Sequence, residues 1–257
     1  MNTAGGMNGY DGKRVPSQRD IAFQYNAGSP DMNCCQANIA RGLGQVAEWA
    51  VTCDDDRLYL NYYGQSFIRS SFNGKEVILK QLTDYPSDGR VHLSVTYEAE
   101  GLLPLSLRVP KWAEGSTIVV NGTAPQALTP GTYFDLEVSN GDEAIIEFGM
   151  PWTFERGKKD QAGYVSVYRG PILFAIEGED RTKELAYADV VEAQKKERTD
   201  KKIHINYDIE IEGGTVHLVD FASAGKYNGA TTPMTYRSWL KVSGVPTSLS
   251  ASEPKAE

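Results

Sequence analysis

Apolar and polar residues alternate in several short stretches of the chain after residue 56. The clearest is "RVHLSVTYE" (residues 90–98), and "RLYLNYY" (57–63) and "LLPLSLRVP" (102–110) follow the same rule. A period of two is typical of strands with one buried face and one wet face. Asn-Gly, Asp-Gly and Pro-Gly pairs lie between these stretches, where they favour hairpin turns. The pattern predicts a mainly β fold of antiparallel β-sandwiches.

One earlier stretch has the period of an α-helix. Its apolar residues recur along a single helix face, at Ile39, Leu43, Val46, Ala47 and Ala50. The acids at residues 54–56 follow this face, and negative charge opposes the dipole at a helix C-terminus. We therefore expect one amphipathic helix that ends and frays near these acids.

The same patterns divide the chain into four parts. We expect a helix-bearing segment at residues 1–55, a first β-sandwich at 56–157, a second at 158–242 and a disordered tail at 243–257. The boundary after residue 157 falls in "FERGKKDQAG", where charge and glycine interrupt the strand pattern. Within the second sandwich, the charged stretch 181–202 could form a short helix, but an exposed connection with one extended segment is the favoured interpretation.

The composition excludes some classes of binding partner but does not identify one. A net charge of -8 and a pI near 5.1 argue against nucleic acid or an anionic membrane, because a phosphate-binding surface needs a basic patch. The sequence has no run of 18 apolar residues, so no membrane span is expected. Three cysteines are too few for a disulfide framework. Free thiols favour a reducing cytoplasm, whereas a signal peptide upstream of residue 1 would change the compartment, so localisation stays open, as does the oligomeric state.

Cys34 and Cys35 stand side by side at the entrance of the expected helix. Two interpretations are open. The thiols pack as small apolar groups, as free cysteines commonly do, or at least one is a thiolate stabilised by the helix N-terminus or by a metal. Two sulfurs do not complete the usual four-ligand zinc shell, so chemistry alone favours packing. Cys53 lies at the far end of the helix, about 27 Å away, and cannot complete such a site.

Five stretches occur in this order: "NCCQANIARGLGQVAEWA", "RLYLNYYG", "YPSDGRVHLSV", "LPLSLRVPKWAEGSTIVVNG" and "GYVSVYRGPILFAIEG". Together they resemble the C-terminal half of glycoside hydrolase family 127 (GH127), which centres on β-L-arabinofuranosidases. The resemblance covers about residues 25–242. It implies that residues 1–55 are a remnant of a catalytic (α/α)6 barrel with its last helix beginning at Cys34, and that the strands form the β-sandwiches that follow the barrel.

The resemblance also implies a chemistry for the cysteine pair. Cys34 corresponds to the catalytic nucleophile, and Cys34 and Cys35 correspond to two ligands of a zinc ion. The family's other two ligands, a Glu and a Cys in a Glu-X-Cys arrangement, and its acid/base Glu belong to upstream segments that have no match here. We therefore expect a fragment of a retaining enzyme that acts on arabinose-containing glycans, with the isolated chain inactive.

A different class of function is a non-catalytic module that binds carbohydrate or another chain through its sandwiches. Tyr62, Tyr63 and Trp112 are the aromatic residues considered for stacking on sugars. Alternation alone buries many aromatic residues, so a core position for these three is the favoured interpretation.

Overall fold

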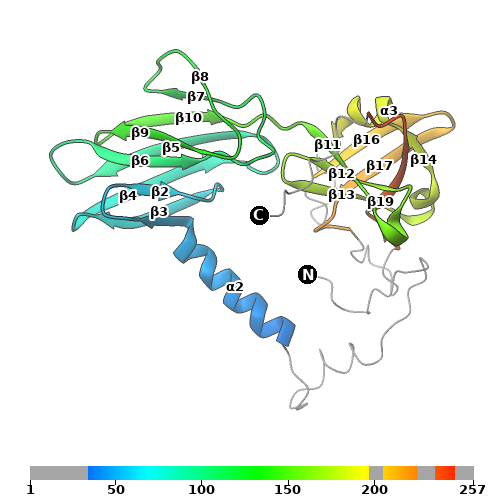
Figure 1. Ribbon diagram of the computed structural model, residues 1–257, viewed down its shortest axis with the longest axis horizontal. Helices are drawn as coiled ribbons and strands as arrows, with labels where there is room; N and C mark the ends of the chain where they lie inside the picture. The colour runs from blue at the N-terminus through cyan, green and yellow to red at the C-terminus, as the bar shows by residue number, and fades with distance from the viewer. Residues whose placement is uncertain (1–33, 197–204, 225–234, 247–257) are drawn as a thin grey trace. The chain divides into compact units, whose positions relative to one another are not determined.

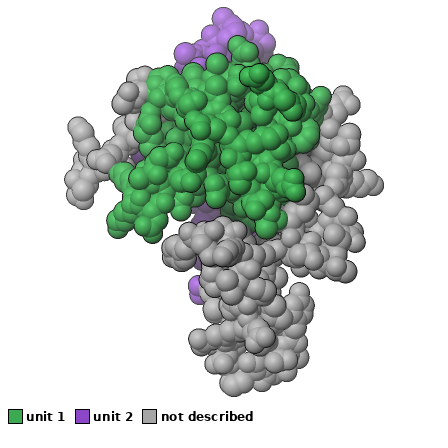
Figure 2. Space-filling model, turned by 90° about the vertical axis from the view of Figure 1, so that its right-hand side faces the viewer, with its two compact units in different colours: residues 1–33, 152–257 green, residues 34–151 purple. Residues whose placement is uncertain are grey.

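The protein is described here by a computed structural model. It describes residues 34–196, 205–224 and 235–246, and side chains from residue 41 onward. The chain divides into two compact units, drawn in different colours in Figure 2: one spans residues 34–151, and the other contains everything from Trp152 onward. The second unit begins at Trp152 because the strand that starts there pairs with a later strand of that unit. The change of unit thus lies six residues before the expected boundary after residue 157.

The 34–151 unit consists of one helix and two sheets (Figure 1). Helix α2 spans Cys34–Ala50 and continues without a linker into strand β1. The four-stranded sheet has the order β1 (Val51–Cys53), β2 (Leu58–Leu60), β6 (Leu103–Arg108), β9 (Tyr133–Val138). The six-stranded sheet has the order β3 (Ser66–Phe72), β4 (Lys75–Thr83), β5 (Arg90–Tyr97), β10 (Glu143–Glu147), β7 (Thr117–Val120), β8 (Gln126–Ala127).

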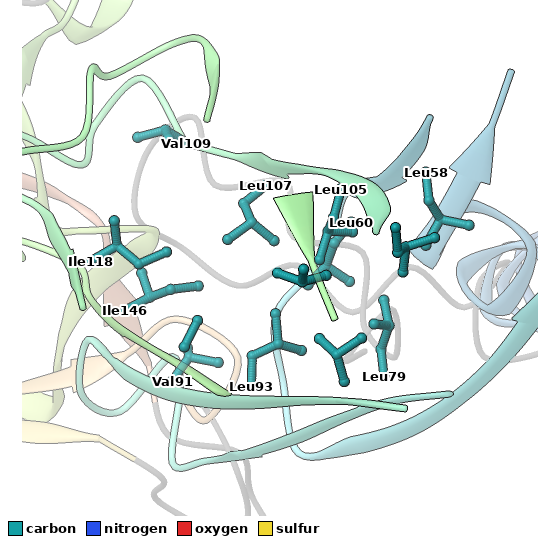
Figure 3. Close-up of a cluster of buried hydrophobic side chains, with 14 of the residues drawn as sticks. Leu58, Leu60, Leu79, Val91, Leu93, Leu105, Leu107, Val109, Ile118 and Ile146 are labelled. Carbon is teal, nitrogen blue, oxygen red and sulfur yellow. The ribbon is translucent and has the colours of Figure 1, made fainter. Parts of the chain in front are cut away.

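The core of this unit lies between its two sheets, as Figure 3 shows. Every second residue of the alternating stretches is buried. From the four-stranded sheet come Leu58, Leu60, Leu105 and Leu107, and from the six-stranded sheet Leu79, Val91, Leu93, Ile118 and Ile146. The polar residues between them point to the outer faces. The period-two pattern therefore identified the buried face of each strand correctly.

One pairing in this unit departs from the expected antiparallel arrangement. Strands β2 and β6 run parallel, with Leu58 opposite Leu105. Between them the chain forms β3, β4 and β5 in the other sheet, so it re-enters the four-stranded sheet in its original direction. Alternation reports which face of a strand is buried but not which way its neighbour runs, and the sequence pattern therefore missed this pair.

The second unit is also built from strands. They are β11 (Trp152–Arg156), β12 (Val165–Arg169), β13 (Ile172–Glu177), β14 (Glu184–Ala186), β15 (Gln194–Lys196), β16 (Asn206–Ile211), β17 (Gly214–Asp220), β18 (Tyr236–Arg237) and β19 (Trp239–Ser243). They form one sheet with the path β14-β19-β12-β13-β17-β16-β15, while β11 pairs with β12 and β18 with β13. The predicted mainly β fold, with a long helix ahead of the strands, is confirmed.

The charged stretch 181–202 is more structured than expected over its described part. After a 3-10 turn, η2 (Gly178–Thr182), it forms β14, the short helix α3 (Tyr187–Val191) and β15; a second 3-10 turn, η1 (Lys159–Gln161), precedes β12. Leu185 and Val190 are fully buried in the core of the second unit. These two apolar side chains hold the segment on the core. Two apolar residues among so many charged ones form no periodic pattern, so no signal in the sequence marks them. The favoured expectation of an exposed connection therefore missed these two buried positions, and the alternative of a short helix is present as α3.

A buried carboxylate in the second unit gives a test of its stability. Asp208 of β16 is 8% exposed and accepts hydrogen bonds from His217 Nδ1, at 2.6 Å, and Lys196 Nζ, at 3.2 Å. Burial alone raises the pKa of this carboxyl, but the bonds from His217 and Lys196 outweigh it and lower the pKa below the ordinary aspartate value. We expect Asp208→Asn to lower the free energy of unfolding at neutral pH by about 1 kcal/mol. This figure allows for solvent screening of the two exposed partners.

The sign of the pH dependence follows from the lowered pKa. The ionised form is favoured in the fold, so its contribution is complete above the unfolded pKa, about 3.9, and is lost as the pH falls through the folded pKa. Urea denaturation at pH 7 and pH 3 should show the difference between wild type and Asp208→Asn shrinking at the lower pH. Glu210→Gln is the control, because Glu210 lies on the same strand and accepts a hydrogen bond from the hydroxyl of Thr215 instead of from a charged side chain. A difference that persists at pH 3 would contradict this account.

Candidate functional site

The paired cysteines stand at the start of helix α2. The helix begins at Cys34, so Cys34 and Cys35 occupy its first turn, where backbone N–H groups lack intrahelical partners. No acidic residue lies in that turn to compete for these donors. The side chains of both cysteines lie outside the described residues, so their contacts stay a matter of proposal. The backbone position agrees with the resemblance, which starts a helix at Cys34.

The other end of α2 is attached to the four-stranded sheet through Asn61, the residue after β2. The backbone N–H of Asn61 donates to the carbonyl of Ala50 at 2.9 Å, and its side-chain Nδ2 donates to the carbonyl of Trp49 at 3.0 Å. Nδ2 also donates to Thr52 Oγ1 at 3.1 Å, and the hydroxyl of Tyr133 in β9 donates to Asn61 Oδ1 at 2.6 Å. Asn61 thus satisfies two of the carbonyls that a helix end leaves free.

The apolar face of α2 is exposed along its described part. Leu43 is 70% exposed, and Val46 and Trp49 are each 49% exposed. Ile39, which the pattern places on the same face, lies outside the residues whose side chains are described. The amphipathic helix itself was correctly predicted. These three exposed side chains follow one another along the helix at intervals of three residues, in contrast to the single exposed apolar residues that are common on protein surfaces.

The three acids after the helix have a different role from the one expected. The helix ends at Ala50, strand β1 follows, and Asp54 shapes the turn from β1 to β2. One of its oxygens accepts from the backbone N–H groups of Asp56, at 2.9 Å, and Arg57, at 2.8 Å, and the other accepts from the Tyr59 hydroxyl at 2.8 Å. These bonds, the one from Tyr59 first, lower the pKa of Asp54. The expectation that these acids end the helix was therefore wrong, because they lie in the hairpin turn between β1 and β2.

Polar residues continue across the outer face of the four-stranded sheet. Arg57 contacts Asp135 at 2.9 Å and donates to the buried Ser106 hydroxyl at 3.0 Å, which in turn donates to Asp135 at 2.5 Å. Beside this network, the rings of Tyr59 and Tyr133 pack edge to face at 5.4 Å. The outer face next to α2 is therefore an ordered, hydrogen-bonded surface, and it carries the groups that hold the helix end.

The aromatic residues considered for sugar stacking divide between core and surface. Tyr63 and Trp112 are half-buried and pack with Tyr85 and Phe148, with ring centroids 4.8 to 6.4 Å apart. The Tyr63 hydroxyl donates to the carbonyl of Arg108 at 2.9 Å, and burial raises the pKa of Tyr63. Tyr62 is 39% exposed. The core interpretation is thus confirmed for Tyr63 and Trp112, and these two rings form no open platform.

The other Cys and His side chains that the structure describes lie in strands of the two units. Cys53 is exposed in β1 at the opposite end of α2. His92 pairs with Glu143 at 3.2 Å, and His217 pairs with Asp208 on the second unit, both as partly exposed strand residues. His204 lies outside the described residues. Among the described side chains, at residues 41–196, 205–224 and 235–246, no three from His, Cys, Asp or Glu form a metal-binding group. No helix in the described part of the chain has the length and apolarity to cross a membrane.

Comparison with known proteins finds a family model that matches part of this chain. Residues 57–152 match the model of the β-L-arabinofuranosidase GH127 middle domain. The chain is thus similar to the C-terminal portion of GH127 proteins. The matched residues coincide with the two-sheet unit that follows α2, and the resemblance read from the sequence is therefore confirmed.

Relatives of this GH127-like chain are longer than it. It is 30% identical to the non-reducing end β-L-arabinofuranosidase of Bifidobacterium longum subsp. longum over 162 residues, which cover 59% of this chain and 24% of the relative. Among solved structures, a GH127 β-L-arabinofuranosidase from Geobacillus stearothermophilus T6 matches with a TM-score of 0.64 at 21% identity, over 81% of this chain and 37% of that one. A second GH127 β-arabinofuranosidase matches with a TM-score of 0.65 at 20% identity, over 86% and 40%. The chain thus spans about a quarter to two fifths of their length, and the two structures establish the fold alone.

Proposed function

We propose that this chain is the C-terminal part of a retaining glycoside hydrolase that acts on β-L-arabinofuranosides in arabinose-containing glycans. The GH127 middle-domain match directly behind a helix that begins with Cys34-Cys35 is the observation that carries the proposal. In this proposal Cys34 is the nucleophile, and the full-length parent protein contributes the acid/base from residues upstream of those in this chain. The isolated chain does not hydrolyse glycosides.

The proposed chemistry uses the thiolate of Cys34 at a helix start. Its sulfur attacks the anomeric carbon, a C–S bond forms and the glycosidic C–O bond breaks, while an upstream acid protonates the departing oxygen. Water then attacks the same carbon and displaces the sulfur, so two inversions give net retention. The helix dipole and the first-turn N–H groups, which have no intrahelical partner, favour negative charge on the sulfur before its attack and again as it departs.

The cysteine pair also fits half of a zinc site. Zn²⁺ prefers four ligands in structural sites and accepts thiolate sulfur readily, and Cys34 and Cys35 supply two sulfurs from adjacent residues. When bound, zinc would keep the thiols deprotonated at neutral pH. Two ligands leave half of the shell to water or to other residues, so a complete site needs donors beyond the pair.

The DNA directly upstream of the Met1 codon tests the proposal. We expect an in-frame sequence that encodes barrel helices and a Glu-X-Cys motif. Expression of that whole reading frame should give an enzyme that hydrolyses 4-nitrophenyl β-L-arabinofuranoside with retention of configuration, observed by proton NMR of the first-formed sugar. An unrelated gene in that position, with a ribosome-binding site before Met1, would refute the proposal and favour the non-catalytic module.

The 257-residue chain by itself gives a second test. Because the pair supplies only two ligands, we expect it to lose zinc during dialysis and to retain well under one equivalent, measured by plasma mass spectrometry. The same preparation should release no 4-nitrophenol above the buffer rate. Stoichiometric zinc retained through dialysis, or turnover that Cys34→Ala abolishes, would show that the chain completes the site by itself.

A further inference from the structure

The attachment of α2 to the sheet determines where the helix, and the cysteines at its start, are held. We infer that Asn61, held in place by Tyr133, is a positioning residue for the helix that carries Cys34. Its relevance to catalysis rests on the proposed function, whereas the attachment itself is a property of the described residues. The middle domain then holds the helix that carries the nucleophile in position.

The hydrogen bonds of Asn61 leave little freedom at the helix end. Both donors at the junction, its backbone N–H and its Nδ2, point to carbonyls of the last helical residues, Ala50 and Trp49. The second amide hydrogen is used as well, because Nδ2 also contacts Thr52 Oγ1 in β1. One side chain therefore bonds both the end of the helix and the strand that follows it.

Tyr133 fixes which way the Asn61 amide faces. Its hydroxyl lies 2.6 Å from Oδ1, and this bond spans 72 residues of sequence. With Oδ1 engaged by a donor, Nδ2 faces the carbonyl of Trp49; the reverse orientation would set two oxygens against each other. Tyr133 in turn is packed against the Tyr59 ring, so the amide is held by the outer face of the four-stranded sheet.

Helix α2 depends on such an attachment because its own sequence stabilises it poorly. Gly42 and Gly44 lie in its interior, where glycine is the least favourable residue after proline. It lacks an acid in the first turn and a base in the last turn to complement the dipole. A 17-residue helix of this kind is only marginally stable in water. Its contact with the sheet therefore determines how often the segment is helical and in which direction the helix axis points.

The position of the cysteines follows from this anchoring. Cys34 and Asn61 act at opposite ends of one helix, about 25 Å apart at 1.5 Å per residue. A small tilt at the sheet end becomes a displacement of ångströms at the first turn, and catalytic groups lose much of their effect when misplaced by about 1 Å. Loss of the Asn61 bonds is therefore expected to impair turnover more than substrate binding.

Two tyrosines make a matched pair for the test. Tyr133→Phe removes the hydroxyl that orients Asn61 and keeps the ring, whereas Tyr59→Phe removes the neighbouring hydroxyl, which bonds Asp54. In the 257-residue chain, we expect hydrogen exchange of the last-turn amides of α2 to accelerate about 5- to 10-fold in Tyr133→Phe, and more in Asn61→Ala. Tyr59→Phe should leave those amides unchanged.

A rescue variant separates helix anchoring from general destabilisation. A Cβ on Gly44 meets no atom within 4 Å, so Gly44→Ala adds helix propensity without a clash. Combined with Tyr133→Phe, it should recover most of the lost protection in α2. In the full-length parent, Tyr133→Phe should lower kcat about 10-fold at unchanged KM, while Tyr59→Phe should not.

Each result bears on one proposal. Equal exchange in α2 for Tyr133→Phe and Tyr59→Phe overturns the anchoring, and so does an equal kcat in an active parent. A full-length parent that hydrolyses no arabinofuranoside overturns the proposed function instead, and the exchange of α2 amides then decides the anchoring by itself.

Discussion

Replacing Cys34 with serine in the full-length parent is expected to abolish arabinofuranoside hydrolysis, with kcat reduced at least about 1,000-fold, as removal of a catalytic nucleophile does in other enzymes. A serine hydroxyl keeps the size of the side chain and loses the thiolate, because its proton is far harder to remove at neutral pH. The variant should also retain less zinc than the wild type, since one of the proposed sulfur ligands is gone. Release of 4-nitrophenol and plasma mass spectrometry measure the two effects.

The chain provides its own control for this substitution. Cys53 is exposed at the far end of α2, so Cys53→Ser should leave both kcat and zinc content within about twofold of the wild type. Cys35→Ser distinguishes a ligand from the nucleophile: it should lower zinc retention as Cys34→Ser does, without removing the attacking sulfur. A Cys34→Ser enzyme with more than a tenth of the wild-type kcat would remove Cys34 from the mechanism.

The strands were predictable because their pattern is local. In "RLYLNYY" and "LLPLSLRVP", each buried leucine is two residues from the next, and the structure buries Leu58, Leu60, Leu105 and Leu107. The direction of pairing was not predictable, since the parallel contact of β2 with β6 depends on how many strands the chain forms in the other sheet. The local pattern shows which face of each strand is buried, whereas the course of the whole chain determines which strands pair and in which direction.

The helix that carries the candidate site was also predictable, yet what holds it was not. Apolar spacing identified α2, and the resemblance identified Cys34 and Cys35 as its chemical residues. Asn61, by contrast, looked like an ordinary polar position of an alternating strand. Its partner Tyr133 is 72 residues away, and only the folded sheet brings the two together. The acids at 54–56 belong to a turn instead of a helix end: Asp54 accepts from backbone N–H groups two and three residues on, which is why aspartate is common in turns.

The buried face of β5 should be the most sensitive part of the middle domain. Leu93 is fully buried between the two sheets, so we expect Leu93→Ala to cost about 2–5 kcal/mol through lost burial and the cavity that remains. Leu82, in the neighbouring strand β4, is 41% exposed, and Leu82→Ala removes the same atoms at a cost of about 0.5 kcal/mol. Urea titrations with exchange at β5 and β10 amides measure the two losses.

This comparison also tests how the middle domain is connected to the cysteine helix. Val51, the first residue after α2, packs against the same core as Leu93, and Asn61 follows strand β2 of that core. A weakened core should therefore release α2, and exchange of its last-turn amides should rise with the global opening in Leu93→Ala but not in Leu82→Ala. If α2 amides kept their protection while β5 and β10 lost theirs, the helix would be held by something other than the sheet, and the anchoring through Asn61 would have to be abandoned.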